Sequence, residues 1–437
     1  MCGIIGYIGD KPATEILIDG LKKMEYRGYD SAGVAYFVGD TLKVVKTAGR
    51  LSVLEEKLLD TTDKGSCGIG HTRWATHGAP SDVNSHPHAS KRVTLVHNGI
   101  IENYLQLKER LSAKGYEFVS DTDTEVAAHL IDSYYDGDLH KAVRLAIREM
   151  KGAYAFGVVA NDDPSRIIAT RKDSPLLVGL GEGNNYIASD MTALLKHTKD
   201  YYLIDEDEIV EVTANSVTVW DENDVLIEKE RKHADWDVEA AEKNGFEHFM
   251  LKEIFETPIV LRRIISNYID ENKIVFADMK KFNNILNQTR RMVIVACGSA
   301  YYVGCAAKYF IESKFGVEVV VEAASEFRYR NPVLRENDLV VAISQSGETA
   351  DTREAIRLAK MRGYPVLAIV NVLGSSIARE ADILLYTDAG PEIAVATTKA
   401  FSAQLAVMYL LAMQLGVIHG RISPLKLSAM IEQFKQL

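Results

Sequence analysis

Five short apolar runs alternate with helical stretches in the second half of the chain, and this alternation constrains the fold more than any other feature. The runs are apolar nearly throughout instead of at every second position, which is typical of strands buried on both faces. The pattern predicts an α/β domain of three layers, in which helices cover both faces of a five-stranded parallel sheet. The predicted strands are Met292 to Ala296, Val317 to Val321, Leu339 to Ile343, Val366 to Val370 and Ile383 to Tyr386.

Hydroxyl side chains follow two of these runs, at the sheet edge where the ligands of such folds bind. Ser344, Ser346 and Thr349 come directly after the third run and open a helix. The N–H groups at a helix start favour an anion, and nearby hydroxyls add donors. Ordinary N-capping would explain the same spacing. Ser299 follows the first run at the same edge, which favours a phosphate site.

The first part of the chain, to about Asp237, predicts a different architecture. Its strand-like runs are separated by Gly, Asn, Asp and Pro turns, so we expect stacked sheets with helices outside, an α+β domain. A charged helical stretch, Val238 to Asn244, continues into His248 to Ile254 and predicts the interdomain connection, with Pro258 just beyond it. The predicted strands include Tyr154 to Ala160, Arg166 to Thr170, Leu176 to Leu180, Ile209 to Thr213 and Ser216 to Trp220.

The composition limits the classes of partner that we expect the protein to bind. The net charge is −11 and no basic run is present, so we expect no nucleic acid partner. The longest late apolar run, Leu405 to Ile418, is too short to span a bilayer and predicts a buried helix, so we expect no membrane partner.

The 4 cysteines are widely spaced, and the opening lacks the features of a secretory signal, which predicts reduced thiols in a cytoplasmic protein. His86-Pro87-His88 is the nearest approach to a metal-binding pattern, but it lacks an obvious third ligand.

Cys2 stands directly behind the initiator methionine. Methionine is usually trimmed before a small residue, which would leave cysteine as the mature N-terminus. A free α-amine titrates near pH 7.7–8.0, so part of it is unprotonated near neutrality. Nucleophile and base would then belong to one residue, which is the N-terminal-amine form of nucleophilic catalysis.

Polar clusters in stretches that look like turns supply companions for this cysteine. Attack on an amide creates an oxyanion, for which Asn98 and Gly99 offer an amide and a backbone N–H. Arg73 could grip the carboxylate of an amino-acid substrate, and Asp123 could pair with its ammonium group. Each cluster also has an ordinary explanation, since Asn-Gly is a common turn pair and Thr122 to Glu125 fits a helix capping box.

Five runs of the first domain resemble the glutaminase domain of the glutamine–fructose-6-phosphate aminotransferase (isomerising) family, whose members are N-terminal-nucleophile amidotransferases. The resemblance implies an αββα domain in which Cys2 attacks the glutamine side-chain amide and forms a γ-glutamyl thioester. Asn98 and Gly99 would line the oxyanion hole. Trp74 would lie in a mobile loop that gates an ammonia passage, and the amino-acid end of glutamine would be held by Arg73, Thr76, His77 and Asp123. The runs are Cys2-Gly3-Ile4-Ile5-Gly6, Tyr26 to Gly33, His71 to Gly78, His97 to Asn103 and Ser120 to Glu125.

The second domain is similar to a sugar isomerase (SIS) domain of the same family. The resemblance implies that Ser344, Gln345, Ser346 and Thr349 bind the phosphate of fructose 6-phosphate, with Val395 and Thr397 near the sugar. Ser299-Ala300 replaces the Thr-Ser pair of many members, which removes one hydroxyl from the expected phosphate shell. The runs that carry the resemblance are Ala296 to Ser299, Ala324 to Arg330, Ser344 to Thr352 and Val395 to Phe401.

The resemblance covers essentially the whole chain and implies its domain boundaries. They are a glutaminase domain over 1–237, a helical linker over 238–285, a first SIS domain over 286–423 and the start of a second SIS region over 424–437. Family members carry a complete second SIS domain and a C-terminal tail, which hold the glutamate, histidine and lysine that move protons and open the sugar ring. We therefore expect glutamine hydrolysis with little or no glucosamine 6-phosphate from these 437 residues.

The same resemblance implies no metal and no organic cofactor, and a homodimer in the full-length form. Two alternatives remain open at this point. One is an amidotransferase for another phosphosugar, because the sequence defines the phosphate grip better than the sugar. The other is a phosphosugar-sensing protein whose second domain binds its ligand without chemistry.

Overall fold

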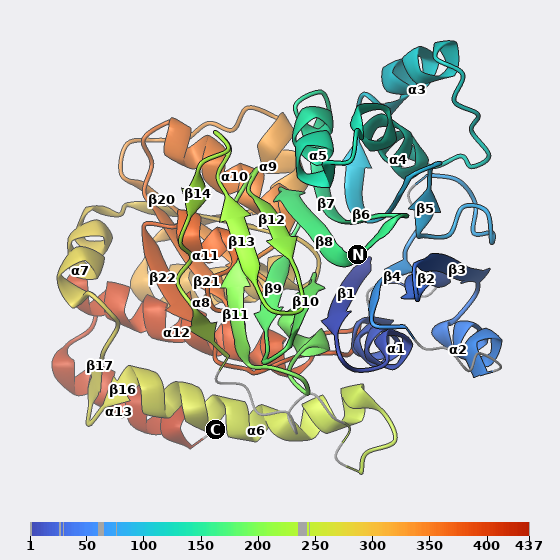
Figure 1. Cartoon of the computed structure of the whole chain (residues 1–437). Coiled ribbons are helices and arrows are strands. Elements are labelled where there is room, and N and C mark those ends of the chain that lie inside the picture. The colour runs from blue at the N-terminus through green and yellow to red at the C-terminus, as the bar shows by residue number, and fades with distance from the viewer. Residues whose placement is uncertain are drawn as a thin grey trace. The chain divides into compact units, whose positions relative to one another are not determined.

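The computed structural model describes residues 2–25, 28, 30–59, 65–75, 77–234, 243 and 245–436. The chain divides into two compact units, unit 1 (Met1–Ala241) and unit 2 (Glu242–Leu437). In Figure 1 the colours of unit 1 run from blue to green and those of unit 2 from yellow-green to red. The predicted connection over Val238 to Asn244 lies almost wholly outside the described residues.

Two antiparallel sheets form the centre of unit 1. The first has the strand order β15-β11-β9-β10-β1-β4-β2-β3, and the second has the order β14-β13-β12-β8-β7-β6-β5. The strands are β1 (Gly3–Gly9), β2 (Ser31–Val38), β3 (Thr41–Ala48), β4 (Cys67–Arg73), β5 (His88–Ala89), β6 (Val93–Ile101), β7 (Gly152–Ala160), β8 (Asp163–Lys172), β9 (Leu177–Leu180), β10 (Asn184–Ala188), β11 (Asp200–Leu203), β12 (Ile209–Val212), β13 (Val217–Trp220), β14 (Leu226–Ile227) and β15 (Lys232–His233).

The two sheets of unit 1 pack against each other through a shared apolar core. Ile4 and Ile187 of the first sheet are buried together with Val96 of the second sheet. A glycine allows the two sheets to approach closely, because a Cβ on Gly157 of the second sheet would lie 2.6 Å from the side chain of Ile187 of the first sheet. The shared core buries the inner faces of both sheets, and β1 is an inner strand of the first sheet.

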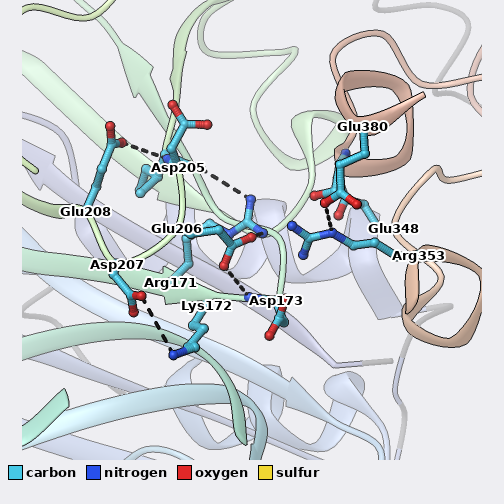
Figure 2. A network of polar contacts seen from close by, with 12 residues as sticks. Arg171, Lys172, Asp173, Asp205, Glu206, Asp207, Glu208, Glu348, Arg353 and Glu380 are labelled. Atoms are coloured by element: carbon cyan, nitrogen blue, oxygen red, sulfur yellow. Dashed lines mark hydrogen bonds and ion pairs between the residues drawn. The ribbon is translucent and has the colours of Figure 1, made fainter. Parts of the chain in front are cut away.

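Helices cover the outer faces of both sheets and complete the αββα layering predicted from the sequence. On the second sheet, α3 (Tyr104–Ala113), α4 (Asp123–Tyr134) and α5 (Leu139–Ile147) share one core cluster with β6 and β7. On the first sheet, α1 (Ala13–Met24) packs its buried face against β1 and β4. The helix α2 (Leu51–Leu59) packs against β3, and the short buried helix η2 (Met191–Ala193) packs against α1. The turn after β8 is fixed by Asp173, whose N–H donates to Glu206 at 2.8 Å, and Arg171 of β8 donates to the same carboxylate at 2.8 Å (Figure 2).

Unit 2 contains the predicted five-stranded parallel sheet, in the order β19-β18-β20-β21-β22. The strand boundaries agree with the five apolar runs to within two residues. The edge strands β19 and β22 are partly exposed, whereas the inner strands β18, β20 and β21 are buried on both faces. Alternate residues of β18 show this directly, since Ile294 belongs to the core on one face and Val295 to the core on the other. The strands are β18 (Arg291–Ala296), β19 (Glu318–Ala323), β20 (Asp338–Ser344), β21 (Val366–Val370) and β22 (Ile383–Tyr386).

Helices form the two outer layers of unit 2. One face of the sheet is covered by α6 (Phe249–Tyr268), α7 (Met279–Gln288), α8 (Ser299–Phe315), α12 (Lys399–Ile418) and α13 (Pro424–Lys435). The other face is covered by α9 (Ala324–Tyr329), α10 (Ala350–Met361) and α11 (Ser376–Glu380). A small hairpin, β16 (Ile269–Asp270) and β17 (Lys273–Ile274), follows α6. The predicted three-layer α/β fold is confirmed.

Two helices of unit 2, α12 and α6, contain residues that the sequence singles out. Among the described residues, α12 is the one helix long and apolar enough to cross a membrane, and most of it is buried in the core of unit 2, where it packs against α6 and α8 (Figure 1). The prediction of a buried helix is therefore confirmed. The helix α6 continues through Pro258. Pro258 and Ile254 lie on the exposed side of α6, so water can solvate the carbonyl that lacks its helical donor.

Candidate active site

The central strand of unit 1 fixes the position of Cys2, which directly precedes β1. Ile4 donates its N–H to the hydroxyl of Ser189 at 2.9 Å, and Ser189 returns its own N–H to the Ile4 carbonyl at 3.0 Å. A Cβ on Gly3 would lie 2.8 Å from the Thr72 hydroxyl, so glycine lets the start of the chain lie close against β4. Cys2 is held at one end of the sheet, at the edge of the sandwich.

The sulfur of Cys2 lies at the loop that follows β4. The N–H of Trp74 donates to Cys2 Sγ at 3.2 Å, and the carbonyl oxygen of Trp74 lies 3.6 Å from the same sulfur. Burial raises the pKa of the Cys2 thiol, and the hydrogen bond from Trp74 opposes that rise without cancelling it. The resting thiol is therefore protonated near neutral pH, and a nucleophilic role requires a base at the moment of attack.

Asn98 lies beside Cys2 and carries the donor expected of an oxyanion hole. Its Nδ2 donates to the carbonyl oxygen of Cys2 at 3.1 Å, and its Oδ1 lies 3.0 Å from Nε2 of His71. The next residue, Gly99, has a φ of +133°, and a Cβ there would lie 2.0 Å from the carbonyl oxygen of Ala153. Only glycine fits this position.

The expectation that Asn98-Gly99 forms a turn is wrong, since both residues lie inside β6. Asn98 is opposite Ala155 of β7, and Gly99 is opposite Tyr154. His71 to Arg73 likewise belong to β4, and the loop begins only at Trp74. Pairing with neighbouring strands outweighs the local turn preference of these residues, because each strand is buried between two others. The polar groups are thus carried by paired strands, which hold them more rigidly than turns would.

Arg73 ends β4 and is buried, with 3% of its surface exposed. Its Nη2 donates to the carbonyl oxygens of His77 and of Gly78, the latter at 3.0 Å. Among the described residues its Nη1 has no hydrogen-bond partner. A buried donor without a partner costs free energy, and a carboxylate is the group that guanidinium N–H donors match best. The arrangement fits the expected clamp for the carboxylate of an amino acid.

Asp123 is the first residue of α4 and is also buried. Its Oδ2 accepts the N–H of Ile101 at 2.8 Å, which fixes the carboxylate beside the end of β6. Thr122 caps the helix by accepting the N–H of Glu125 at 3.3 Å. The N-cap part of the predicted capping box is thus confirmed, but its reciprocal bond is not made, because the Glu125 carboxylate accepts the N–H groups of Val119 and Ser120. The cap is compatible with a binding role for Asp123, because it determines where the first helical residue lies.

The remaining predicted glutamine ligands lie on the loop after β4. The Trp74 side chain is 48% exposed, as expected for a residue at the mouth of a site. The His77 ring packs edge-on against Tyr104, the first residue of α3, with ring centroids 5.3 Å apart. Thr76 lies outside the described residues, so its predicted role stays a prediction.

Two further residues position this loop, and the sequence analysis assigned neither of them a role. Asp30 accepts the N–H of Ala75 through Oδ2, and its own N–H donates to the carbonyl of Arg73 at 3.2 Å. Asn84 accepts the N–H of Asp121 at 3.0 Å and donates to the carbonyl of Ala79 at 3.0 Å. Asp30 belongs to one of the runs that carry the resemblance, which was the available signal. Asn84 lies outside all of them.

The two histidines of the His86-Pro87-His88 segment are buried within unit 1. The His86 ring stacks on His71 with centroids 4.0 Å apart, and His88 Nε2 lies 3.1 Å from the Thr122 hydroxyl. Within the ranges that the structure describes, no group of three or more His, Cys, Asp or Glu side chains is arranged to hold a metal ion. These histidines instead make hydrogen bonds and ring contacts behind the Cys2 site.

In unit 2 the predicted phosphate-binding residues form a closed turn between β20 and α10. The Ser344 hydroxyl accepts the N–H of Gly347 at 3.0 Å and lies 2.9 Å from the Thr349 hydroxyl. Ser346 accepts the N–H of Glu348 at 3.2 Å. Gly347 has a φ of +66° and approaches Ser375, whose Oγ would lie 1.9 Å from a Cβ there. The turn can only form with glycine at this position.

The turn leaves the start of α10 open to an anion. Within the described residues, the side chain of Thr349, the N-cap residue of this 12-residue helix, makes no capping hydrogen bond, so ordinary N-capping does not account for Thr349. Gln345 follows Ser344 in the turn. Glu348 accepts the N–H of Ser376 at 2.8 Å and Arg353 donates to Glu380 at 2.6 Å, which together attach the turn and α10 to α11 (Figure 2). Free helical N–H groups beside hydroxyls are a suitable phosphate site.

The other predicted sugar ligands lie at the same carboxyl edge of the sheet. Ser299 is exposed and opens α8 directly after β18. Val395 is 75% exposed, and Thr397 donates its hydroxyl to Glu392 at 2.5 Å. Glu392 and Glu253 hold the segment that carries Val395 and Thr397, and the sequence analysis did not single out either carboxylate.

Comparison with known proteins agrees with this architecture. Residues 59–248 match the family model of a glutamine amidotransferase domain, and residues 285–414 match that of an SIS domain. The chain therefore contains a glutamine amidotransferase domain followed by an SIS domain.

Curated relatives identify the family. The chain is 50% identical over 436 residues to the glutamine–fructose-6-phosphate aminotransferase [isomerizing] of Clostridium tetani, covering 99% of this chain and 72% of the relative. The enzyme of the same name from Caldanaerobacter subterraneus is 50% identical over 440 residues, with 100% of this chain and 72% of the relative covered. That of Clostridium perfringens is 51% identical over 423 residues, covering 96% and 69%. The chain belongs to the glutamine–fructose-6-phosphate aminotransferase (isomerizing) family, as its resemblance predicted.

Proposed function

We propose that unit 1 releases ammonia from glutamine and that unit 2 binds fructose 6-phosphate, as parts of an enzyme that forms glucosamine 6-phosphate and glutamate. The observation that carries the first half is the placement of Arg73, which is buried with a free Nη1 donor at the end of β4, directly before the loop residue Trp74 that contacts the sulfur of Cys2. Family membership and the names of the relatives support the choice of substrates.

Glutamine is held by its amino-acid end in this proposal. The substrate carboxylate accepts from Nη1 of Arg73, and its ammonium group pairs with Asp123, whose carboxylate is fixed by the N–H of Ile101. His77 and Thr76 provide the remaining contacts to the amino-acid end of glutamine. The side-chain amide then reaches Cys2, where Trp74 covers the site from the solvent side.

The reaction proceeds in two steps. Removal of Met1 frees the α-amine of Cys2, which takes the proton of the thiol as the sulfur attacks the amide carbon. The oxyanion accepts hydrogen bonds from Nδ2 of Asn98 and the N–H of Gly99. The α-ammonium then protonates the amide nitrogen, the C–N bond breaks, and ammonia leaves a γ-glutamyl thioester. Water attacks this thioester, and release of glutamate restores the thiol.

In unit 2 the phosphate is bound at the start of α10 by Ser344, Gln345, Ser346 and Thr349, with Ser299 at the neighbouring strand end. The sugar lies toward Val395 and Thr397. Hydroxyls and free N–H groups converge there on one anion position. Ammonia from unit 1 is added to the keto carbon of fructose 6-phosphate in the complete reaction, for which no cofactor is proposed. We place the enzyme in the cytoplasm, where its four free cysteines stay reduced, and expect a homodimer of the full-length form.

The test is an assay of both products. The purified protein, with its mature N-terminus established by mass spectrometry, is incubated with glutamine in the presence and absence of fructose 6-phosphate. We expect glutamate release that Cys2→Ser abolishes, while binding of fructose 6-phosphate to that variant is retained. Glucosamine 6-phosphate is measured in the same samples. A protein that begins at Cys2 and releases no glutamate would overturn the proposal.

A further inference from the structure

A buried histidine lies directly behind the oxyanion donor. His71, on β4, has no exposed surface. Its Nε2 lies 2.9 Å from the carbonyl oxygen of His97 and 3.0 Å from Oδ1 of Asn98. Asn98 in turn donates from Nδ2 to the carbonyl oxygen of Cys2 at 3.1 Å. A single line of hydrogen bonds therefore connects a β6 carbonyl, a β4 ring, the Asn98 amide and the nucleophile residue.

The carbonyl of His97 determines the direction of every bond in this line. A carbonyl oxygen can only accept, so Nε2 of His71 has to carry its hydrogen. Because Nε2 is a donor, the Asn98 atom that faces it has to be the oxygen. The amino group of Asn98 is then directed to Cys2. The amide orientation, which coordinates alone often leave open, is here dictated by the backbone.

The surroundings keep this histidine in one state. Its ring stacks on His86 at 4.0 Å between centroids and 14° between planes, and its Nδ1 has no partner among the described residues. Burial is the main cause that lowers the pKa of His71 to about 3, with nearby His97 and Arg73 acting in the same direction. The ring is therefore neutral throughout the working pH range, with its hydrogen on Nε2.

We propose that His71 is a positioning residue for glutamine hydrolysis, which locks the Asn98 amide with its NH2 group directed at the oxyanion. The inference rests on the proposed function and adds a residue to it. Without His71 the amide can turn over and present its oxygen to the negatively charged oxygen of the intermediate. Loss of one oxyanion donor typically costs about 10²–10³ in kcat, so the orientation of this amide is worth a comparable factor.

A double-variant cycle tests the proposal. His71→Phe keeps a ring and removes the donor, and Asn98→Ala removes the group that the donor orients. We expect each single variant to lower the glutaminase kcat by about 10²-fold, with a much smaller change in KM for glutamine. If His71 acts through Asn98, the double variant equals Asn98→Ala within about twofold. Losses that multiply would overturn the proposal, as would a raised KM with kcat unchanged.

Two further variants separate positioning from folding. His71→Gln returns an N–H donor near the position of Nε2 and is expected to restore part of the lost kcat. His129→Phe removes another buried histidine of unit 1, which bonds Ser90 at 2.8 Å and the Glu117 carbonyl at 3.1 Å and touches neither Cys2 nor Asn98. It is expected to keep its kcat. Equal loss in both phenylalanine variants would mean that His71 serves only the fold.

The wild-type protein provides a test that needs no variant. A neutron structure at neutral pH shows whether deuterium lies on Nε2 of His71 and whether the ND2 group of Asn98 faces Cys2. Deuterium on Nδ1 alone, or a turned amide, would overturn the inference even if every variant misfolded. A wild-type enzyme that releases no glutamate would instead contradict the proposed function, so the two failures are distinguishable.

Discussion

Arg73 donates from Nη2 to the carbonyl oxygen of Gly78 at 3.0 Å, across the loop that follows β4. Gly78 has a φ of +75°, and a Cβ there would lie 2.6 Å from Nδ2 of Asn84. The loop is thus folded back on the arginine that precedes it. Nη2 of the guanidinium thus donates to backbone carbonyl groups. Nη1 has no hydrogen-bond partner among the described residues, so it can donate to a ligand.

Replacing Arg73 by lysine is expected to raise the KM for glutamine. A charge-assisted hydrogen bond contributes about 1.5–3 kcal/mol, so KM should rise about 10- to 100-fold, with a smaller effect on kcat because the carboxylate is remote from the reacting amide. Steady-state kinetics with glutamine and with its α-carboxamide analogue check this, since the variant should discriminate less between the two substrates.

Arg144→Lys is the matched control for this measurement. Arg144 is buried in the same unit and donates to the Asp207 carbonyl and to Asp224, both at 3.2 Å, and it lies in no proposed binding contact. Its variant should keep the KM of the wild type. A normal KM in Arg73→Lys would remove Arg73 from its assigned role.

How much of this site can be predicted from the sequence depends on how far apart in the chain the interacting residues lie. The five strands of unit 2 follow from apolar runs, because burial on both faces leaves its mark within each strand. The position of Asn98 cannot be predicted from its neighbours in the sequence. Its Asn-Gly pair favours a turn locally, but pairing with Ala155 of β7 places Asn98 inside strand β6. The bond between His71 and Asn98 joins neighbouring strands β4 and β6 of different sheets, and no local pattern encodes it.

The stability of unit 1 is expected to fall as the pH is lowered from 6.5. Burial lowers the pKa of His71 and of His88 to about 3 and that of His86 well below its usual range. In the unfolded chain these rings take up protons near pH 6.5. Between that pH and about 3 the unfolded state binds more protons, so each ring lowers the free energy of unfolding by about 1.4 kcal/mol per pH unit as the pH falls. Above pH 6.5 the contribution is fully present.

Urea unfolding followed by tryptophan fluorescence measures this effect in the whole chain, because Trp74 and Trp220, two of its 3 tryptophans, lie among the described residues of unit 1. His88→Gln removes one titrating ring and should make the decline shallower by about 1.4 kcal/mol per pH unit. A free energy of unfolding that is the same at pH 7 and pH 5 would contradict the prediction.

Replacing Glu253 by leucine is expected to weaken fructose 6-phosphate binding and to leave glutamine hydrolysis unchanged. Glu253 on α6 accepts the N–H groups of Ile393 at 2.6 Å and Ala394 at 3.1 Å, directly before Val395. Loss of two buried hydrogen bonds, at about 0.5–1.5 kcal/mol each, should release this segment and raise the Kd for the sugar phosphate about tenfold or more. Isothermal titration calorimetry measures the affinity. Glu336→Leu, at an exposed position of unit 2, should bind normally, and equal affinities in both variants would show that Glu253 does not support the site.

Gly99→Ala is expected to abolish most glutaminase activity, and a second glycine separates the two reasons for this. The added Cβ would lie 2.0 Å from the Ala153 carbonyl, at a φ of +133°. Gly137 has a similarly unfavourable φ of +106°, but no atom lies within 4 Å of a Cβ there. Gly137→Ala should therefore cost only the backbone strain, about 1–2 kcal/mol in the free energy of unfolding, with kcat unchanged.

Gly99→Ala adds a collision with β7 that displaces the oxyanion N–H, so we expect kcat to fall by about 10²-fold or more. Steady-state kinetics and urea unfolding of both variants make the comparison. Should Gly99→Ala lose stability like Gly137→Ala and keep its kcat, the N–H of Gly99 would have no part in stabilising the oxyanion.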